Sequence, residues 1–214
     1  MAITATIYKF AGTALVACCA MSCASDAETG NDGFGASEQA ATTAATAVLR
    51  DASGNVVGRV VFTSSGGPTL IAVTARLPAG TGVDGIHGFH VHANDNPANG
   101  DGCIADPAQP ATTHFVSADG HFNPGGATHG DHAGDMPALF FTESGNAAMT
   151  FVHDRFSPAA IRDRAVILHQ GADNYGNIPV GAAANQYTPN SAEATTLTQN
   201  TGNAGARIAC GVIQ

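Results

Sequence analysis

Apolar and polar residues alternate along several short segments of the chain, as they do in β-strands with one buried face. The clearest segment is TLIAVTARL (69–77), in which one face is formed by Ile71, Val73, Ala75 and Leu77. On this basis seven segments are predicted to be strands: 46–50, 56–63, 69–77, 86–92, 148–153, 165–169 and 207–213. The turn sequences DASGN and SSGGP between the first three favour antiparallel hairpins.

Helical periodicity is not sustained along the chain, and only residues 157–164 are predicted to form as much as one helical turn. Two long segments, 93–120 with its continuation to 135 and 170–205, are expected to be loops. Long ordered loops on a rigid β scaffold commonly carry function. The pattern therefore predicts an all-β domain, of sandwich or barrel type, with two long functional loops.

The N-terminal region differs from the rest. Residues 1–23 are predicted to be a secretion signal, because Lys9 precedes a short apolar run. The sequence LVAC ends at Cys18 and resembles a bacterial lipobox, in which that cysteine is lipidated; Cys23 is a weaker second candidate, and an ordinary cleaved signal is the alternative. Residues 24–45 are small, polar and acidic and are predicted to be a disordered tether, which leaves 46–214 for the domain. The protein is thus expected to be exported to the periplasm or cell envelope and held at a membrane by a lipid.

The net charge of the chain and the length of its apolar segments limit the partners that it is expected to have. No stretch of about 20 apolar residues occurs, so no transmembrane helix is expected. All 17 carboxylates follow Cys18, against seven arginines, which leaves the mature chain near −10. A strongly acidic chain is not expected to bind nucleic acid. Two cysteines, Cys103 and Cys210, remain in the domain and are expected to pair, since exported domains favour disulfides.

Histidines supply the candidate chemistry. In GIHGFHVH (85–92), His90 and His92 are two residues apart on a predicted strand, so both imidazoles project from one face and form half of a metal site. His87 would point to the other face and is interpreted as a structural histidine that bonds to backbone. His169 ends the apolar run AVIL, and the segment HFNPGGATHGDHAGD (121–135) is too polar for a core element and rich in metal-binding side chains.

Four segments, GIHGFHVH, HFNP…HG…HAGD, VILHQGAD and TGNAGARIACGVI, resemble the signature segments of copper/zinc superoxide dismutase. The resemblance covers nearly all of 46–214 in the order of that family, and the segment between 179 and 201 is similar to the mycobacterial-type bacterial branch. It implies an eight-stranded Greek-key barrel, copper and zinc as cofactors, and superoxide as substrate. It does not indicate whether the protein is a monomer or a homodimer.

By motif position, the resemblance implies a role for each site residue. The copper ligands would be His90, His92, His121 and His169, and the zinc ligands His121, His129, His132 and Asp135. Asp173 would hydrogen-bond one ligand histidine from each metal, Arg207 would bind the anionic substrate, and Cys103 and Cys210 would tie the metal loop to the barrel. His114 and His153 match no ligand position.

The implied reaction dismutes superoxide to oxygen and hydrogen peroxide by a Cu(II)/Cu(I) cycle, with Arg207 and His121 as the catalytic residues. His121 would be both a bridging ligand and a proton carrier. One alternative is a copper-only dismutase with a weak or absent zinc site. A second is an inactive metal-binding module of the same fold, which the presence of every copper ligand and of Arg207 disfavours.

Two features depart from the family pattern. No basic residue lies between Asp173 and Thr201, where many members carry a lysine, so electrostatic steering of superoxide is expected to be weak. His129 and His132 are separated by only two residues, fewer than is common in the family. Three residues span at most about 10 Å, which still permits both imidazoles to reach one zinc ion. His132 is the least certain ligand, and Asp131 is a nearby substitute.

Overall fold

The computed structural model describes residues 41–78, 84–100, 102–176 and 192–214. These residues belong to one compact unit, Gln39–Gln214. The predicted signal, Cys18, Cys23 and most of the predicted tether lie outside the described residues. No helix among the described residues has both the length and the apolar character needed to span a membrane.

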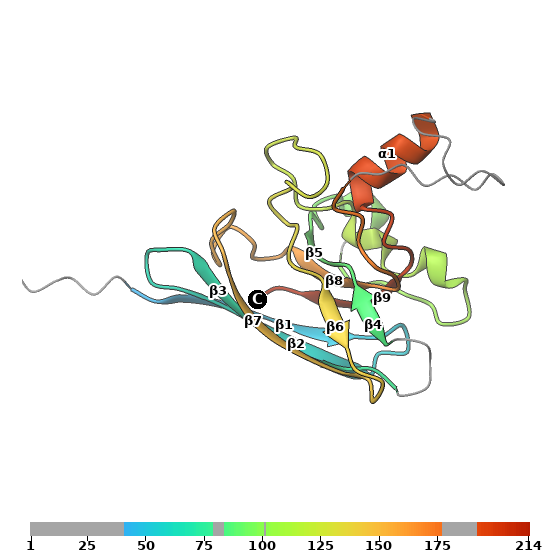
Figure 1. The fold of residues 1–214 in the computed structure, drawn as a ribbon, viewed down its shortest axis with the longest axis horizontal. Helices are drawn as coiled ribbons and strands as arrows, with labels where there is room; N and C mark the ends of the chain where they lie inside the picture. Colours follow the sequence, from blue (N-terminus) through green and yellow to red (C-terminus); the bar gives the residue numbers. More distant parts are fainter. Residues whose placement is uncertain (1–40, 79–83, 101, 177–191) are drawn as a thin grey trace, which may run out of the picture. The chain divides into compact units, whose positions relative to one another are not determined.

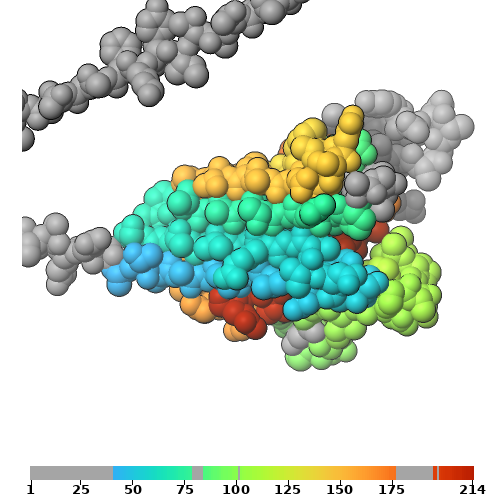
Figure 2. Space-filling view, turned by 90° about the horizontal axis from the view of Figure 1, so that it is seen from below, coloured from blue at the N-terminus to red at the C-terminus, as the bar shows by residue number. Residues whose placement is uncertain are grey.

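The domain is built on an antiparallel sheet of seven strands, in the order β5-β8-β9-β1-β2-β3-β7 (Figure 1). Its strands are β1 (Thr43–Arg50), β2 (Val56–Ser64), β3 (Thr69–Arg76), β5 (Phe89–His92), β7 (Asn146–His153), β8 (Ala165–His169) and β9 (Arg207–Val212). A second sheet of two strands pairs β4 (Gly85–His87) with β6 (Leu139–Phe141). Figure 2 shows the outer face of β1, β2, β3 and β7, which lie side by side.

The predicted strand 86–92 is split at Gly88, so that its first part pairs with β6 and its second part with β8. A Cβ on Gly88 would lie 2.7 Å from the Cβ of Ala204, so only glycine permits this approach of the loop before β9. Counting β4 and β5 as one broken strand gives eight strands, and the sheet curls on itself. The all-β class with a barrel-like architecture is confirmed.

Alternation places one face of each strand in the core, as the pattern predicted. Val60, Phe62 and Ile71 from the first hairpins are fully buried and pack with Phe89 of β5 and Leu168 of β8. A second buried cluster contains Phe115, Ile167 and Cys210 and lies under the long loop that follows β5.

The helical content differs from the prediction. Helix α1 (Ala192–Thr201) lies within the second long loop, and its threonine-rich sequence has no apolar period to signal it. Thr198 is fully buried, so contacts with the rest of the domain stabilise the helix. The prediction of a helical turn at 157–164 was wrong: this segment forms successive turns, with Ala160 N donating to Ser157 O and Arg164 N to Ile161 O. Three short 3₁₀ helices, Pro97–Asn99, Ala111–Thr113 and Val116–Ala118, lie in the first long loop.

Strand bounds differ in smaller ways. β1 begins three residues before the predicted start, because Ala45 is buried and pairs with Phe62. β7 begins two residues earlier than predicted, and β6 was not predicted at all, since three residues are too few to show a period.

Candidate metal centre

Strand β5 presents two imidazoles on the side away from the core. Phe89 and Val91 are buried in the core, so the alternate residues His90 and His92 project to the opposite face, where the long loops bury them completely. The neighbouring strand β8 ends at His169, whose N–H donates to Gly88 O at 2.9 Å. Three histidines from two adjacent strands therefore point into one space.

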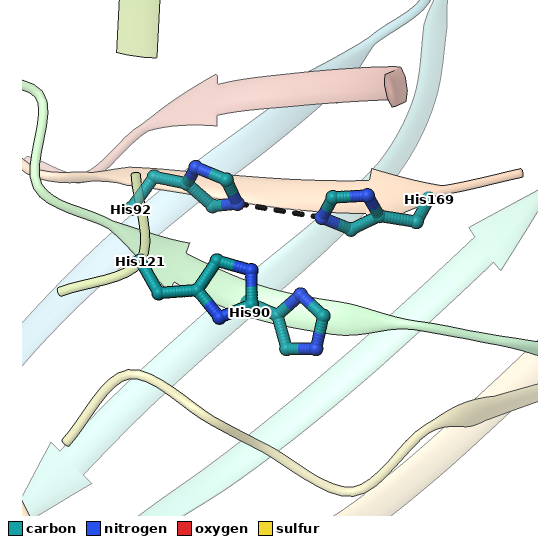
Figure 3. Close-up of side chains that lie close together, drawn as sticks. All are labelled: His90, His92, His121 and His169. Atoms are coloured by element: carbon teal, nitrogen blue, oxygen red, sulfur yellow. Dashed lines mark hydrogen bonds between the residues drawn. The ribbon is translucent and has the colours of Figure 1, made fainter. Parts of the chain in front are cut away.

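His121 joins them from the loop that runs along the free edge of β5. An isolated bridge pairs His92 with His121, and Phe122 N donates to Val91 O at 2.8 Å. Figure 3 shows the resulting cluster, in which His92 Nε2 and His169 Nε2 are 3.3 Å apart. One ring nitrogen from each of His90, His92, His121 and His169 lies within 4.8 Å of those of the others.

Burial favours the neutral state of three of these imidazoles, His92, His121 and His169, and the neutral imidazole is the state that binds a metal. It lowers the pKa of His92 and of His169 well below the usual value, and nearby histidines add to the effect. Burial also lowers the pKa of His121 to about 3, although Asp135 opposes this change.

The same loop continues along β5 and brings Asp135 beside His90. Val91 N donates to Gly134 O at 2.8 Å, and a bridge pairs His90 with Asp135. A Cβ on Gly134 would lie 2.2 Å from Val91 O, so a glycine is required for the loop to approach the strand this closely. The backbone pairing fixes the second group of ligands relative to the first.

Three histidines converge on Asp135 through their Nδ1 atoms. Its Oδ1 lies 2.8 Å from His121 Nδ1 and 3.4 Å from His132 Nδ1, and its Oδ2 lies 3.3 Å from His129 Nδ1. Burial alone would raise the pKa of Asp135, but hydrogen bonds from these imidazoles hold it far below its usual range. The cluster offers three nitrogens and one carboxylate, a donor set that suits zinc.

The short link between His129 and His132 does not prevent this arrangement. His132 is buried, and its Nδ1 lies 3.3 Å from His121 Nδ1. Asp131, the substitute considered from the sequence, points elsewhere: its side chain is 79% exposed and lies 3.4 Å from Arg155 Nη2. Arg155 Nη1 also donates to Gly130 O and His132 O, so this arginine clamps the link from outside. His132 therefore contacts His121 and Asp135, whereas Asp131 does not point toward them.

Asp173 connects the two groups of histidines. Its Oδ2 lies 2.6 Å from His90 Nε2 and its Oδ1 lies 2.7 Å from His129 Nε2, and both histidine side chains are fully buried. Burial alone would raise the pKa of Asp173, but these hydrogen bonds lower it. Burial would lower the pKa of His129, but Asp135 and Asp173 raise it to about 9. A carboxylate that accepts from Nε2 leaves each Nδ1 directed at its cluster.

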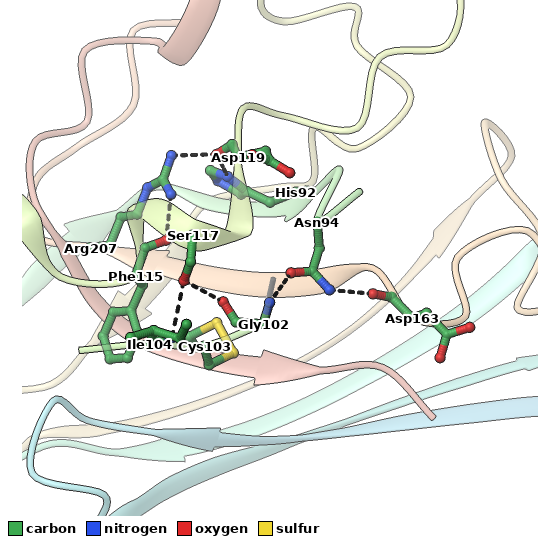
Figure 4. Close-up of a disulfide and its surroundings, with 11 residues drawn as sticks. His92, Asn94, Gly102, Cys103, Ile104, Phe115, Ser117, Asp119, Asp163 and Arg207 are labelled. Carbon is green, nitrogen blue, oxygen red and sulfur yellow. Dashed lines mark hydrogen bonds between the residues drawn. A yellow bond between two sulfur atoms is a disulfide. The ribbon is translucent and has the colours of Figure 1, made fainter. Parts of the chain in front are cut away.

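Arg207 lies at the mouth of the His90–His169 cluster. Its guanidinium donates to Phe115 O at 2.6 Å and to Asp119 O at 2.5 Å (Figure 4). Asp119 O also accepts from His92 Nδ1 at 2.8 Å, so one carbonyl positions both the arginine and a ligand. Burial lowers the pKa of Arg207 to about 10, which leaves it charged at neutral pH.

These carbonyls were not predicted from the sequence. Phe115 and Asp119 flank a 3₁₀ helix and have left-handed φ angles of 57° and 64°. No side-chain motif marks a backbone acceptor, so only the folded loop shows it.

The disulfide holds this loop in place. Cys103 and Cys210 are bonded, as predicted, with Cα atoms 5.5 Å apart. The next residue, Ile104, accepts from Phe115 N at 2.8 Å and donates to Ser117 Oγ at 3.1 Å. The covalent bond therefore anchors the loop whose carbonyls orient Arg207. A depression of about 300 Å³ lies in front, lined by Thr112, Val116, His169, Thr201, Asn203, Gly205, Ala206 and Arg207.

The remaining histidines bond to backbone. His87 Nδ1 lies 2.9 Å from His169 O, as the structural interpretation of this residue required. His114 Nε2 lies 3.0 Å from Asp106 O, and His153 Nε2 lies 2.9 Å from Ala133 O. Among the described residues two groups have ligand atoms within 4.8 Å of one another: His90, His92, His121 and His169, and His90, His121, His129 and Asp135. His87, His114 and His153 belong to neither group, and His132 also lies outside the second, although its Nδ1 lies 3.3 Å from His121 Nδ1 and 3.4 Å from Asp135 Oδ1. Tyr175 was not predicted, and its ring stacks on His129 at 5.8 Å between centroids.

The buried atoms fit metal ions. Among the described residues, His90 Nδ1 and His121 Nε2 are buried and have no hydrogen-bond partner. A buried ring nitrogen without a hydrogen-bond partner costs free energy, and a bound cation would remove that cost. His121 carries one nitrogen toward each group.

Known proteins share these features. A family model described as copper/zinc superoxide dismutase (SODC) matches residues 56–213. A protein named "Superoxide dismutase [Cu-Zn]" from Mycolicibacterium paratuberculosis is 32% identical over 188 residues, which cover 85% of this chain and 79% of that protein.

Two solved structures are also similar. Cu/Zn superoxide dismutase from Brucella abortus is 26% identical, with a TM-score of 0.55 over 81% of this chain and 100% of that one. The clock protein EA4 is 28% identical, with a TM-score of 0.53 over 79% of this chain and 92% of that one.

Proposed function

The chain belongs to the copper/zinc superoxide dismutase family, and on this premise we propose how its residues divide the work of the reaction. The enzyme converts superoxide and protons to oxygen and hydrogen peroxide, with copper and zinc as cofactors. Copper would be held by His90, His92, His121 and His169, and zinc by His121, His129, His132 and Asp135.

The observation that carries this assignment is the position of His121. Its Nδ1 lies 2.8 Å from Asp135 Oδ1, in the proposed zinc group. Its Nε2 is buried without a hydrogen-bond partner among the described residues and belongs to the ring that lies 4.0 Å from the ring of His90, between centroids. One imidazole with a nitrogen in each group is what a bridge between two ions requires.

Copper supplies the one-electron couple that takes an electron from one superoxide and returns it to a second. Arg207 provides the only charged side chain that lines the depression among the described residues, so it would bind the substrate anion there. The carbonyls of Phe115 and Asp119 keep the guanidinium oriented. His121 Nε2 is available to hold a proton and deliver it to the reduced oxygen, while Asp135 retains the ring through Nδ1.

Asp173 would act by positioning both groups. It accepts from Nε2 of His90 and of His129, which keeps the proton on that nitrogen and leaves Nδ1 free to bind a metal. Because the same carboxylate accepts a hydrogen bond from one histidine of each group, Asp173 connects the two proposed metal sites.

We also propose that residues 1–23 direct export, that Cys18 is lipidated and that 24–42, the part of the predicted tether that precedes β1, connect the domain to the membrane in the periplasm or cell envelope. The Cys103–Cys210 disulfide supports an oxidising compartment, and the similar mycobacterial enzyme is compatible with export. The mass of the mature protein tests the proposal, since lipidation at Cys18 adds acyl chains to a chain that begins there. A mature N-terminus at another residue, without lipid, would contradict it.

The two alternatives are not favoured. A copper-only enzyme needs no second set of ligands, yet His132 and Asp135 are both buried and converge with His129. An inactive module would tolerate loss of Arg207 or a copper ligand, and all of them are present.

The decisive experiment is metal analysis of the purified protein beside a superoxide decay assay. We expect one copper and one zinc per chain and rapid decay of superoxide. His121→Ala should abolish the activity and disturb both metals, whereas His114→Ala, outside both groups, should change neither. Full copper loading without activity would refute the proposed function, and full activity with copper and no zinc would refute the zinc site.

A further inference from the structure

The outer face of β1, β2, β3 and β7, here called the basic face, has an unusual charge. These four strands contain no Asp or Glu, although the whole chain has a formal charge of −9. Their only arginines are Arg50, Arg59 and Arg76, all of them exposed. Asp51, Glu143 and Asp154 lie just beyond the ends of these strands in the sequence, and none of them forms an ion pair with these arginines among the described residues.

The arginines lie on three adjacent strands. Arg59 of β2 pairs with Val48 of β1 and with Thr74 of β3. Arg50 follows a register shift between Leu49 and Arg50, where it pairs with Val56, and its Nη1 donates to Gly54 O at 2.9 Å. Arg76 lies two residues beyond Thr74 on the same face and diagonal to Arg59, a spacing of about 7–8 Å between Cα atoms. Like charges this close repel one another unless an anion lies between them.

The other four arginines of the chain all have partners. Arg155 lies against Asp131 and Arg164 against Asp95, while Arg162 and Arg207 donate to backbone carbonyls. No hydrogen bond or ion pair of Arg59 or Arg76 is found among the described residues. These two guanidinium groups are therefore available to a ligand.

Apolar side chains lie on the same face as Arg59 and Arg76. A hollow of about 690 Å³ is lined by Arg59 and Arg76 together with Val48, Thr74, Ala147 and Ala148. On the same sheet Val56 is 61% exposed, and Leu70 and Val152 are 45% and 66% exposed. Figure 2 shows the broad surface that these four strands form. Arginines interspersed with aliphatic side chains suit a surface that offers both negative charge and hydrocarbon.

We propose that the basic face docks on a membrane surface rich in anionic lipid, with the metal centre directed away from it. Val60 and Phe62, which alternate with Arg59 and Val61, pack in the same core as Phe89, which alternates with His90. The arginines and the ligand histidines thus lie on opposite outer sides of one core, so docking leaves the Arg207 mouth open to solvent.

Two other occupants fit less well. A second copy placed face to face would bring six arginines together without one carboxylate. The acidic segment 24–42 of the same chain carries Asp26, Glu28, Asp32 and Glu38, but its only large apolar residue is Phe34, which gives it little apolar surface to match the exposed Val and Leu side chains.

Vesicle sedimentation tests the proposal with the metal-loaded full chain carrying Cys18→Ser, which excludes lipid attachment. We expect stronger binding to vesicles with about one-third phosphatidylglycerol than to pure phosphatidylcholine, and weaker binding as salt rises. Arg59→Gln and Arg76→Gln should each weaken binding about fivefold and the double variant roughly 30-fold, because each arginine near such a surface contributes similarly. Superoxide decay in solution should not change in these variants.

Arg162→Gln is the matched control, since it removes the same charge from another part of the domain and should leave binding within about twofold. Equal binding to both vesicle types, or a double variant that binds as the parent does, would overturn the proposal. Binding to anionic vesicles that appears only after Asp26, Glu28, Asp32 and Glu38 are changed to amides would also overturn it. The acidic segment would then cover the basic face, and the lipid would not be its ligand.

Discussion

Asp173→Asn is the most informative single change, because it alters charge and hydrogen bonding at nearly constant volume. In the native protein both carboxylate oxygens accept, one from His90 Nε2 at 2.6 Å and one from His129 Nε2 at 2.7 Å. An asparagine can accept through Oδ1 from only one of them, and its amide nitrogen must donate to the other. The second imidazole then needs an unprotonated Nε2, which moves its proton to Nδ1.

That proton would occupy the nitrogen that faces a metal site. For His90 this is the buried Nδ1 that lacks a hydrogen-bond partner, and for His129 it is the Nδ1 that lies 3.3 Å from Asp135. Loss of such a supporting carboxylate typically costs 10–100-fold in metal affinity or activity. Two buried bonds to a charged group are also removed, each contributing about 1.5–3 kcal/mol. We therefore expect affinity for at least one metal to fall by at least about tenfold, with a lower stability of the metal-free protein.

Competition with a chelator measures the copper and zinc affinities of the demetallated protein, and superoxide decay is measured at saturating metal. Asp131→Asn is the matched control, since the same chemical change is made on a side chain that is 79% exposed. If Asp173→Asn folds normally and binds both metals within twofold of the parent, the carboxylate does not set the orientation of either histidine.

Other parts of the site respond to simpler changes. His132→Ala should reduce zinc well below one ion per chain while copper is retained, as metal analysis would show; normal zinc content would place the ion elsewhere. The value of kcat/KM should be nearly flat with ionic strength, because Arg207 is the only charge that lines the mouth among the described residues, and a steep fall with salt would contradict this. Gly202→Ala should lower stability by about 2 kcal/mol or more in a thermal melt, since its φ is +60° and its Cβ would meet Asp173 Oδ1 at 1.9 Å; Gly54→Ala, in open space, should cost less. Reduction of the disulfide should lower the free energy of unfolding by about 2–5 kcal/mol in a denaturant titration, and an unchanged midpoint would refute this.

The all-β class was predictable because strand periodicity is a local property. The alternation in 69–77 needs no knowledge of distant residues, and β3 follows it closely. The split at Gly88 was not predictable in this way, since the pattern continues through it and only the approach of Ala204 demands a break. Helix α1 was missed for a similar reason: its stability comes from contacts made by residues such as Thr198, and not from its own periodicity.

The candidate site likewise has features that the sequence predicts and features that only the fold shows. The identity of the candidate ligands follows from histidine spacing and from the resemblance of four short motifs to one family. The separation of His129 and His132 in the sequence does not show whether His132 lies beside the other candidate zinc ligands. A link of this length permits that position but does not by itself cause it. The hydrogen bonds of Arg155 to Gly130 O and His132 O and the pairing of Gly134 with β5 hold His132 beside His121 and Asp135.

The sequence by itself determined which residues can bind a metal, which strands bury one face, and that two cysteines would pair, because each depends on residue type and local order. Only the tertiary structure decided which nitrogen of each imidazole faces its cluster, which carbonyls hold Arg207, and that Asp131 turns outward. It also showed that Arg59 and Arg76 have no partner among the described residues and line one hollow. These features depend on contacts between distant segments, and local sequence does not encode such distances.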